Sequence, residues 1–127
     1  VHLNGEIVRD VDNLVVTAGK NYVADRMKNN STVMSHMAIG SSATSAAAGN
    51  TALGTELGRV SLTSSAVSSA VVTYIASFAA GTGTGAVTEA GILNASSGGT
   101  MLCRTVFSVV NKGSADSMTI TWTVTVS

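Results

Sequence analysis

The chain has 127 residues, the length of one domain, and a chain of this size can bury a substantial hydrophobic core. Seven basic residues balance seven acidic ones, so no charge excess points to a nucleic acid or to an anionic membrane. Charged residues make up only 11%, against about 25% in ordinary soluble domains. Because Ser, Thr and Ala are easily desolvated, this composition indicates either extensive contact with other subunits or a compact, weakly charged β domain.

The sequence also argues against several kinds of site. A single cysteine, Cys103, excludes an intrachain disulfide. No apolar run reaches the roughly 18 residues of a transmembrane helix. The two histidines, His2 and His36, do not stand at metal-ligand spacing from each other or from the cysteine. We therefore expect no cofactor, no bound metal, no nucleic-acid partner and no membrane contact.

The amino-terminal part contains the one convincing helix. Residues 1–12 alternate loosely. They predict either a short strand over 3–8, broken near Gly5, or an arm lying on a neighbouring subunit. A helix is predicted over 13–28, with Thr17 as its N-cap. Val23 and Met27 are four residues apart, so they share one helix face, which we expect to meet the core.

The middle of the chain alternates less regularly. Strands are expected over 33–40 and 59–65, where apolar and polar residues alternate. The Ser, Ala and Gly residues of 41–50 predict a surface loop, 51–57 one helical turn, and 64–69 a turn.

The second half consists of strands separated by glycine-containing turns. Gly81–Gly85 lacks the Lys-Ser or Lys-Thr pair of a phosphate loop, so a hairpin loop is favoured. Gly91 stands inside a strand and predicts a bulge or a close contact. The fold class is therefore mainly β: one domain, 1–127, forming an antiparallel β-sandwich or jelly-roll-like barrel with one N-terminal helix. The expected strands are 70–80, 86–94, 100–111 and 118–127.

The closing strand has the clearest pattern, because its two faces differ completely. One face is apolar and predicts a core-facing side. The other is a row of threonines without charge, which we expect to lie against another subunit or another layer. The apolar residues are Met118, Ile120, Trp122, Val124 and Val126, and the threonines are Thr119, Thr121, Thr123 and Thr125.

Few other residues are candidates for a site. Glu89 and Arg104 fall in two strands of a predicted hairpin, where they either face each other or reach a partner subunit. Cys103 with His36 would resemble a nucleophile pair, but Cys103 lies in an apolar run that favours an inert, buried thiol. The oxygen ligands of 10–13 lack the Gly and distal Glu of a calcium loop, which favours a solvated turn.

Two runs resemble a pattern of tailed-bacteriophage virion proteins, in which a Thr-Glu-x-Gly strand turns through a Gly-containing loop into a second strand. They are Thr88-Glu89-Ala90-Gly91-Ile92-Leu93-Asn94 and Gly98-Gly99-Thr100-Met101-Leu102-Cys103-Arg104-Thr105-Val106-Phe107. The stretches 13–27, 37–40 and 51–57 resemble small structural proteins of phages. The pattern recurs in tail-fibre, baseplate and head-decoration proteins alike.

The resemblance implies a β-rich, non-enzymatic virion component that forms a homo-oligomer. Short length and the absence of a heptad or β-helical repeat favour a capsid decoration, or cement, protein over a fibre shaft. Its expected partners are copies of itself, with a trimer favoured, and the major capsid protein. The expected location is the virion, on the head rather than the tail, after assembly in the host cytoplasm. The alternatives are a tail-fibre or baseplate attachment module and a carbohydrate-binding β-sandwich.

Overall fold

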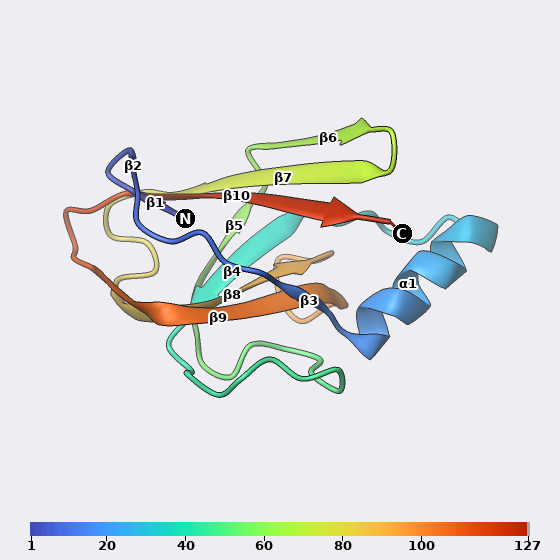
Figure 1. Cartoon of the computed structure of the whole chain (residues 1–127), viewed down its shortest axis with the longest axis horizontal. Helices are drawn as coiled ribbons and strands as arrows, with labels where there is room; N and C mark the ends of the chain where they lie inside the picture. Colours follow the sequence, from blue (N-terminus) through green and yellow to red (C-terminus); the bar gives the residue numbers. More distant parts are fainter. Residues whose placement is uncertain (127) are drawn as a thin grey trace.

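The computed structural model describes residues 1–126 and shows an antiparallel β-sandwich (Figure 1). Sheet A has the strand order β2-β1-β10-β7-β6, and sheet B has the order β3-β9-β8-β4-β5. The mainly β, antiparallel prediction is confirmed. Sheet A contains β1 (His2–Leu3), β2 (Glu6–Ile7), β6 (Ser64–Ser68), β7 (Val71–Phe78) and β10 (Met118–Thr125). Sheet B contains β3 (Leu14–Val15), β4 (His36–Gly40), β5 (Glu56–Ser61), β8 (Gly85–Leu93) and β9 (Met101–Lys112).

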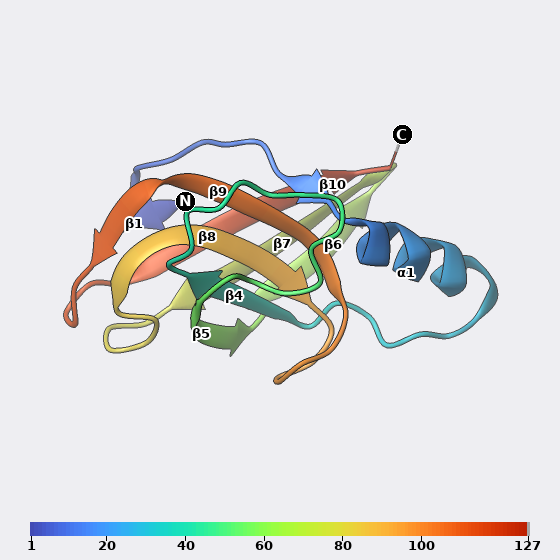
Figure 2. The same cartoon turned by 90° about the horizontal axis from the view of Figure 1, so that it is seen from below.

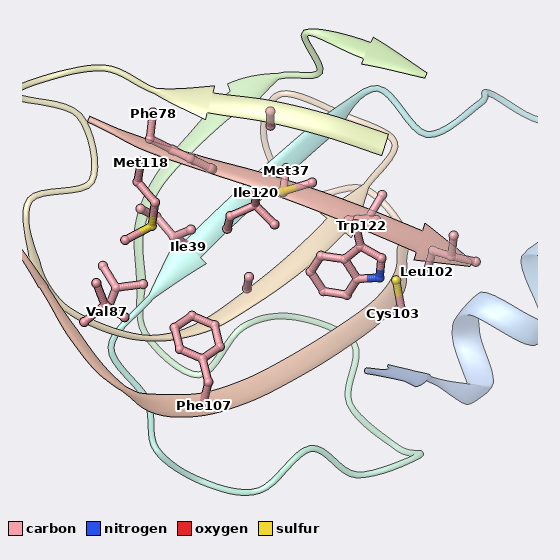
Figure 3. Close-up of a cluster of buried hydrophobic side chains, with 14 of the residues drawn as sticks. Met37, Ile39, Phe78, Val87, Leu102, Cys103, Phe107, Met118, Ile120 and Trp122 are labelled. Carbon is pink, nitrogen blue, oxygen red and sulfur yellow. The ribbon is translucent and has the colours of Figure 1, made fainter. Parts of the chain in front are cut away.

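The main core lies between the two sheets, and the apolar face of β10 supplies one side of it. Met118, Ile120 and Trp122 are at most 4% exposed. Figure 3 shows these side chains pointing from β10 toward Ile39 and Phe107 of sheet B. The predicted inward face of the closing strand is confirmed from Met118 to Val124. It is wrong for Val126, which follows the end of β10 and is 62% exposed, and Ser127 lies outside the described residues.

Strand β7 runs beside β10 along its full length, and the two strands share their inward face. Tyr74 pairs with Trp122, and Phe78 pairs with Met118. Tyr74 and Phe78 therefore lie on the same face of β7, and the strand predicted over 70–80 is present as β7. The glycine-rich loop 81–85 differs from its prediction, because β7 belongs to sheet A and β8 to sheet B. This loop is a crossover between sheets rather than a hairpin loop.

The helix α1 (Thr17–Lys28) differs from the prediction in three ways. It follows three short strands instead of opening the chain, and 14–15 form β3 on the edge of sheet B. Val16 occupies the N-cap position without a side-chain hydrogen bond, so Thr17 is the first helical residue. Val23 and Met27 are 38% and 85% exposed, so the prediction that they face the core is wrong.

The helix is exposed because it contacts sheet B only through its first turns. A β-carbon at Gly19 would lie 2.0 Å from the carbonyl oxygen of Leu102 in β9. The missing side chain thus lets the helix backbone approach the strand closely. Beyond that contact, α1 projects from one end of the sandwich (Figure 1), so the later apolar residues have no sheet beneath them.

Two predictions for the middle of the chain are wrong. Residues 64–69 were expected to form a turn, yet 64–68 form strand β6, and the chain reverses at Ser69 and Ala70. Residues 51–57 contain no helical turn, and β5 begins at Glu56. In both places, pairing with a neighbouring strand supplies structure that serine-rich or alanine-rich local sequence does not indicate.

Residues 1–12 fold onto their own chain. Strands β1 and β2 form a small hairpin around Asn4 and Gly5, both with positive φ angles, and β1 pairs with β10. The segment is thus extended as the strand alternative predicts, but it forms two short strands with a reversal between them instead of one strand over 3–8. No helix in residues 1–126 has the length and apolar character needed to span a membrane.

The Gly19 contact gives a direct stability prediction. We expect Gly19→Ala to destabilise the protein by about 1–3 kcal/mol, because the new methyl group forces α1 away from β9. This loss exceeds the roughly 0.5–1 kcal/mol that Ala ordinarily gains over Gly inside a helix. Urea unfolding measures the difference. Gly49→Ala is the matched control, since a β-carbon at Gly49 meets no atom within 4 Å; equal stability of the two variants would contradict the close-contact role.

Candidate functional site: a buried ion pair that holds a long loop

The most unusual polar feature is an ion pair on the outer face of sheet B. Glu89 of β8 and Arg104 of β9 are 0% and 2% exposed. In the β8–β9 register, Arg104 stands opposite Gly91, two residues from Glu89 on the same face. Arg104 Nε donates to Glu89 Oε1 over 3.0 Å. The cross-strand alternative predicted for these residues is confirmed.

The Glu89 carboxylate also accepts three backbone hydrogen bonds from a loop. Ser42 N–H donates to Oε2 over 2.9 Å, Thr55 N–H to Oε2 over 2.8 Å, and Gly54 N–H to Oε1 over 2.8 Å. Burial alone would raise the pKa of Glu89, but these three donors and Arg104 outweigh it and hold the pKa below its usual range. The carboxylate is therefore ionised and fully engaged at neutral pH.

Arg104 holds the same loop from its other nitrogens. Nη1 donates to Asn50 Oδ1 over 3.1 Å, and Nη2 donates to the Thr44 carbonyl oxygen over 3.0 Å. Together the two charged residues fix both ends and the middle of residues 41–55, which we name the clasped loop. Figure 2 shows this loop, in teal to green, running across β8 and β9. The predicted surface loop over 41–50 is confirmed, with charged anchors beneath it.

Small residues make room for the ion pair and for the clasped loop above it. A β-carbon at Gly40 would lie 2.3 Å from the Thr55 carbonyl oxygen and 2.5 Å from Glu89 Oε2. At Gly91, a β-carbon would lie 3.0 Å from the Leu53 side chain. The close contact predicted for Gly91 is thus confirmed. Beneath the loop and the start of α1 lies a second small core, formed by Val16, Ala38, Leu93 and Met101, with Leu53 packed on it.

This geometry fits a structural role for the pair. Every polar atom named above bonds within the chain, and neither side chain presents exposed surface to a second molecule. The alternative that Glu89 and Arg104 contact a partner subunit stays a prediction, and in the chain as folded both side chains are buried. Their effect on any partner would act through the clasped loop, whose shape they determine.

The other candidate residues do not come together. Cys103 is 0% exposed in the inter-sheet core, and burial raises its pKa far above the usual thiol range, so the reactive thiolate does not form. His36 instead lies within hydrogen-bond distance of Ser35 Oγ (2.7 Å) and Ser61 Oγ (3.4 Å). Residues 10–13 lie in irregular structure before β3, and nowhere in 1–126 do three His, Cys, Asp or Glu side chains gather around a possible metal position.

The second candidate feature is the outer face of sheet A, which we name the threonine face. The four predicted threonines of β10 lie there; Thr121, Thr123 and Thr125 are exposed, and Thr119 is half-buried. Ser77 Oγ and Thr119 Oγ1 are 3.2 Å apart across the strands. The remaining members are the in-register partners on β7, β6, β1 and β2, namely Val71, Thr73, Ile75, Ser77, Ser64, Ala66, Ser68, His2 and Ile7. The face contains no Asp, Glu, Lys or Arg.

No family model matches the chain, and neither the curated proteins nor the solved structures include a significant match. The clasp and the threonine face are therefore the basis for the functional argument.

Removing the Glu89 charge should weaken the attachment of the clasped loop to sheet B. We expect Glu89→Gln to lower the free energy of unfolding by about 3–5 kcal/mol, because Arg104 is left as an uncompensated buried charge. Urea unfolding measures this loss, and hydrogen exchange at the Ser42, Gly54 and Thr55 amides should accelerate in parallel. The control is Glu56→Gln, which breaks a partly exposed pair with Arg59 (2.7 Å) and should cost at most about 1 kcal/mol. A loss equally small at Glu89 would contradict the clasp.

The lowered pKa of Glu89 also predicts a pH dependence. A carboxyl group with a depressed pKa in the folded state contributes stability above its unfolded value of 4.5, and that contribution disappears as pH falls through the folded value. We expect the urea midpoint of the wild type to fall more steeply below pH 4.5 than that of Glu89→Gln. Asp25 and Asp116, whose pKa values are also lowered, contribute the same slope to both proteins. Parallel curves would show that Glu89 does not titrate as described.

Proposed function

We propose that this protein is a non-enzymatic structural component of a tailed-phage particle, which decorates the capsid. On this proposal it binds at junctions between capsid subunits and stabilises the head. The observation that carries the proposal is the charge-free threonine face. The resemblance of the β8–β9 hairpin sequence to virion proteins indicates a phage particle as the location. The threonine face offers the surface through which the protein would assemble on it.

A charge-free face suits assembly because contact requires desolvation. Stripping water from an exposed Lys or Glu without pairing it costs far more than doing so for a hydroxyl group, which can re-form hydrogen bonds with a partner. The distribution of charge along the chain supports the proposal. No Asp, Glu, Lys or Arg occurs between Val60 and Thr88 or between Ser117 and Thr125, the segments that contain β6, β7 and β10.

The rigid clasped loop offers a second uncharged surface on the opposite side of the sandwich. Residues 41–55 contain only Ser, Ala, Thr, Gly, Asn and Leu. A decoration protein must contact more than one neighbour, and two charge-free surfaces on opposite sheets would allow it. Several weak contacts per copy, repeated over an oligomer, would add up through avidity.

The direct test is to mix the purified protein with heads that lack it. We expect binding at regular capsid positions and an increased resistance of the heads to heat. Copy number in the native particle separates the alternatives, because dozens to hundreds of copies indicate the head, whereas a handful indicate a tail-fibre or baseplate module. Heads that neither bind the protein nor gain heat resistance would overturn the capsid proposal.

A charge on the threonine face should impair assembly selectively. We expect Thr121→Lys to reduce apparent affinity for heads at least about tenfold, while the free energy of unfolding changes by roughly 0.5 kcal/mol or less, as at other exposed sites. Thr84→Lys is the matched control, since Thr84 is exposed in the crossover loop outside the threonine face. Co-sedimentation with heads and urea unfolding are the two measurements. Normal binding by Thr121→Lys would mean that this face is merely solvated.

A further inference from the structure

The four edge strands of the sandwich differ in how well they are protected against pairing with another chain. Strands β2 and β3 have only two residues each, and β5 carries Glu56 and Arg59. Strand β6 has five residues, all exposed, without a charge or a proline. Short length, charge and proline are the usual devices that keep an edge from pairing, and β6 has none of them.

Strand β6 has an open backbone edge. It pairs with β7 on one side, and within residues 1–126 no strand pairs with its other side. In Figure 1, β6 forms the outermost strand of sheet A. Alternate N–H and C=O groups of this strand therefore point outward without a backbone partner, which is the arrangement that accepts an added strand.

We propose that β6 pairs in antiparallel orientation with β6 of a second copy of this chain, around a two-fold axis at Ala66. The sequence Ser64-Ser65-Ala66-Val67-Ser68 is nearly the same read in either direction. Pairing about Ala66 places Ser64 opposite Ser68 of the second copy and Ser65 opposite Val67 of the second copy. In such a two-fold contact the same segment of both copies meets itself, so each pair of opposed residues occurs twice.

The side chains on the inward side of the new pair fit each other. Val67 is 74% exposed in the single chain, an unusual position for a large apolar residue on a strand. In the pair, Val67 lies directly opposite Ser65 of the second copy. It borders an apolar groove of about 470 Å³. The groove is lined by Tyr22, Val33, Met34, Val67, Val72 and Tyr74, together with Arg26 and Ser65–Ala66.

The electrostatics and size of the contact determine its strength. Neither β6 strand brings a charge to the pairing, and the charge nearest to it among the groove residues is Arg26. The pairing of five residues is much smaller than the roughly 1,600 Å² of a standard stable interface, so the dimer should be concentration-dependent. It also joins the threonine faces of two copies into one continuous uncharged surface. The pairing is proposed for the isolated protein, so its test does not depend on whether the protein binds capsids.

Cysteine cross-linking tests the register. Across the two-fold axis, Ala66 faces Ala66 of the second copy at the Cα separation of directly opposed residues, about 4.5–5.5 Å, which a disulfide spans. We expect Ala66→Cys to form covalent dimers under mild oxidation. Ser64→Cys is the matched control, because its two copies would be about 13 Å apart along the strands and cannot bridge. The native Cys103 is buried and does not interfere. Cross-linking of Ala66→Cys no faster than Ser64→Cys would overturn the proposal.

Mass measurement tests the contact without an added cysteine. By sedimentation velocity over a range of concentrations, we expect the wild type to shift from monomer toward dimer. Val67→Lys should remain monomeric, because each copy would place a charge at the new pair. Ile7→Lys is the control, since Ile7 is 71% exposed at the opposite edge of the same sheet and should leave the dimer intact. A wild type that stays monomeric, or a dimer that Val67→Lys leaves unchanged, contradicts the proposal.

Discussion

The ionised carboxylate of Glu89 is the constraint on which the outer side of sheet B depends. A buried charge is tolerated only when it is paired and fully hydrogen-bonded. Arg104 neutralises it, and three loop amides complete its shell. The loop must therefore return to the same point at Ser42 and at 54–55. Gly40 is required there because a side chain would occupy the space of the carboxylate.

The clasped loop makes the two sheets differ in how many of their faces are covered. Sheet B is covered on both faces, by sheet A on one side and by the loop and the start of α1 on the other. This explains the run of buried residues from Val87 to Leu93 in β8, where the alternation expected of a half-exposed strand is absent. Sheet A has only one covered face, and its strand β10 keeps the two-residue alternation, whereas Val71–Ile75 of β7 are all half-buried. The uncovered sheet face of the molecule is thus the outer face of sheet A.

The sequence predicts burial correctly where the alternation within one strand determines which side chains face inward. It predicts burial incorrectly where a contact with a segment distant in the sequence determines it. The alternation of β10 identified its inward face because a half-buried strand has period two. Val23 and Met27 had a plausible helical spacing, yet whether they are buried depends on how far sheet B extends beneath α1. Glu89 and Arg104 were recognised as possible partners, but no local signal identified the loop amides. A buried charge in a strand predicts that donors exist, without indicating which segment supplies them.

Strand β6 is another element whose structure depends on a distant contact, and its free edge bears on assembly. Its serine-rich sequence has weak intrinsic strand preference, so only pairing with β7 makes it a strand. A strand formed by pairing on one side is competent to pair on the other, and nothing in its side chains opposes this. The free edge and the uncharged threonine face belong to the same sheet, whereas α1, β5 and the segment before β3 hold most of the exposed charges. Charge therefore keeps one part of the surface hydrated, while sheet A retains the features that permit contact with other subunits.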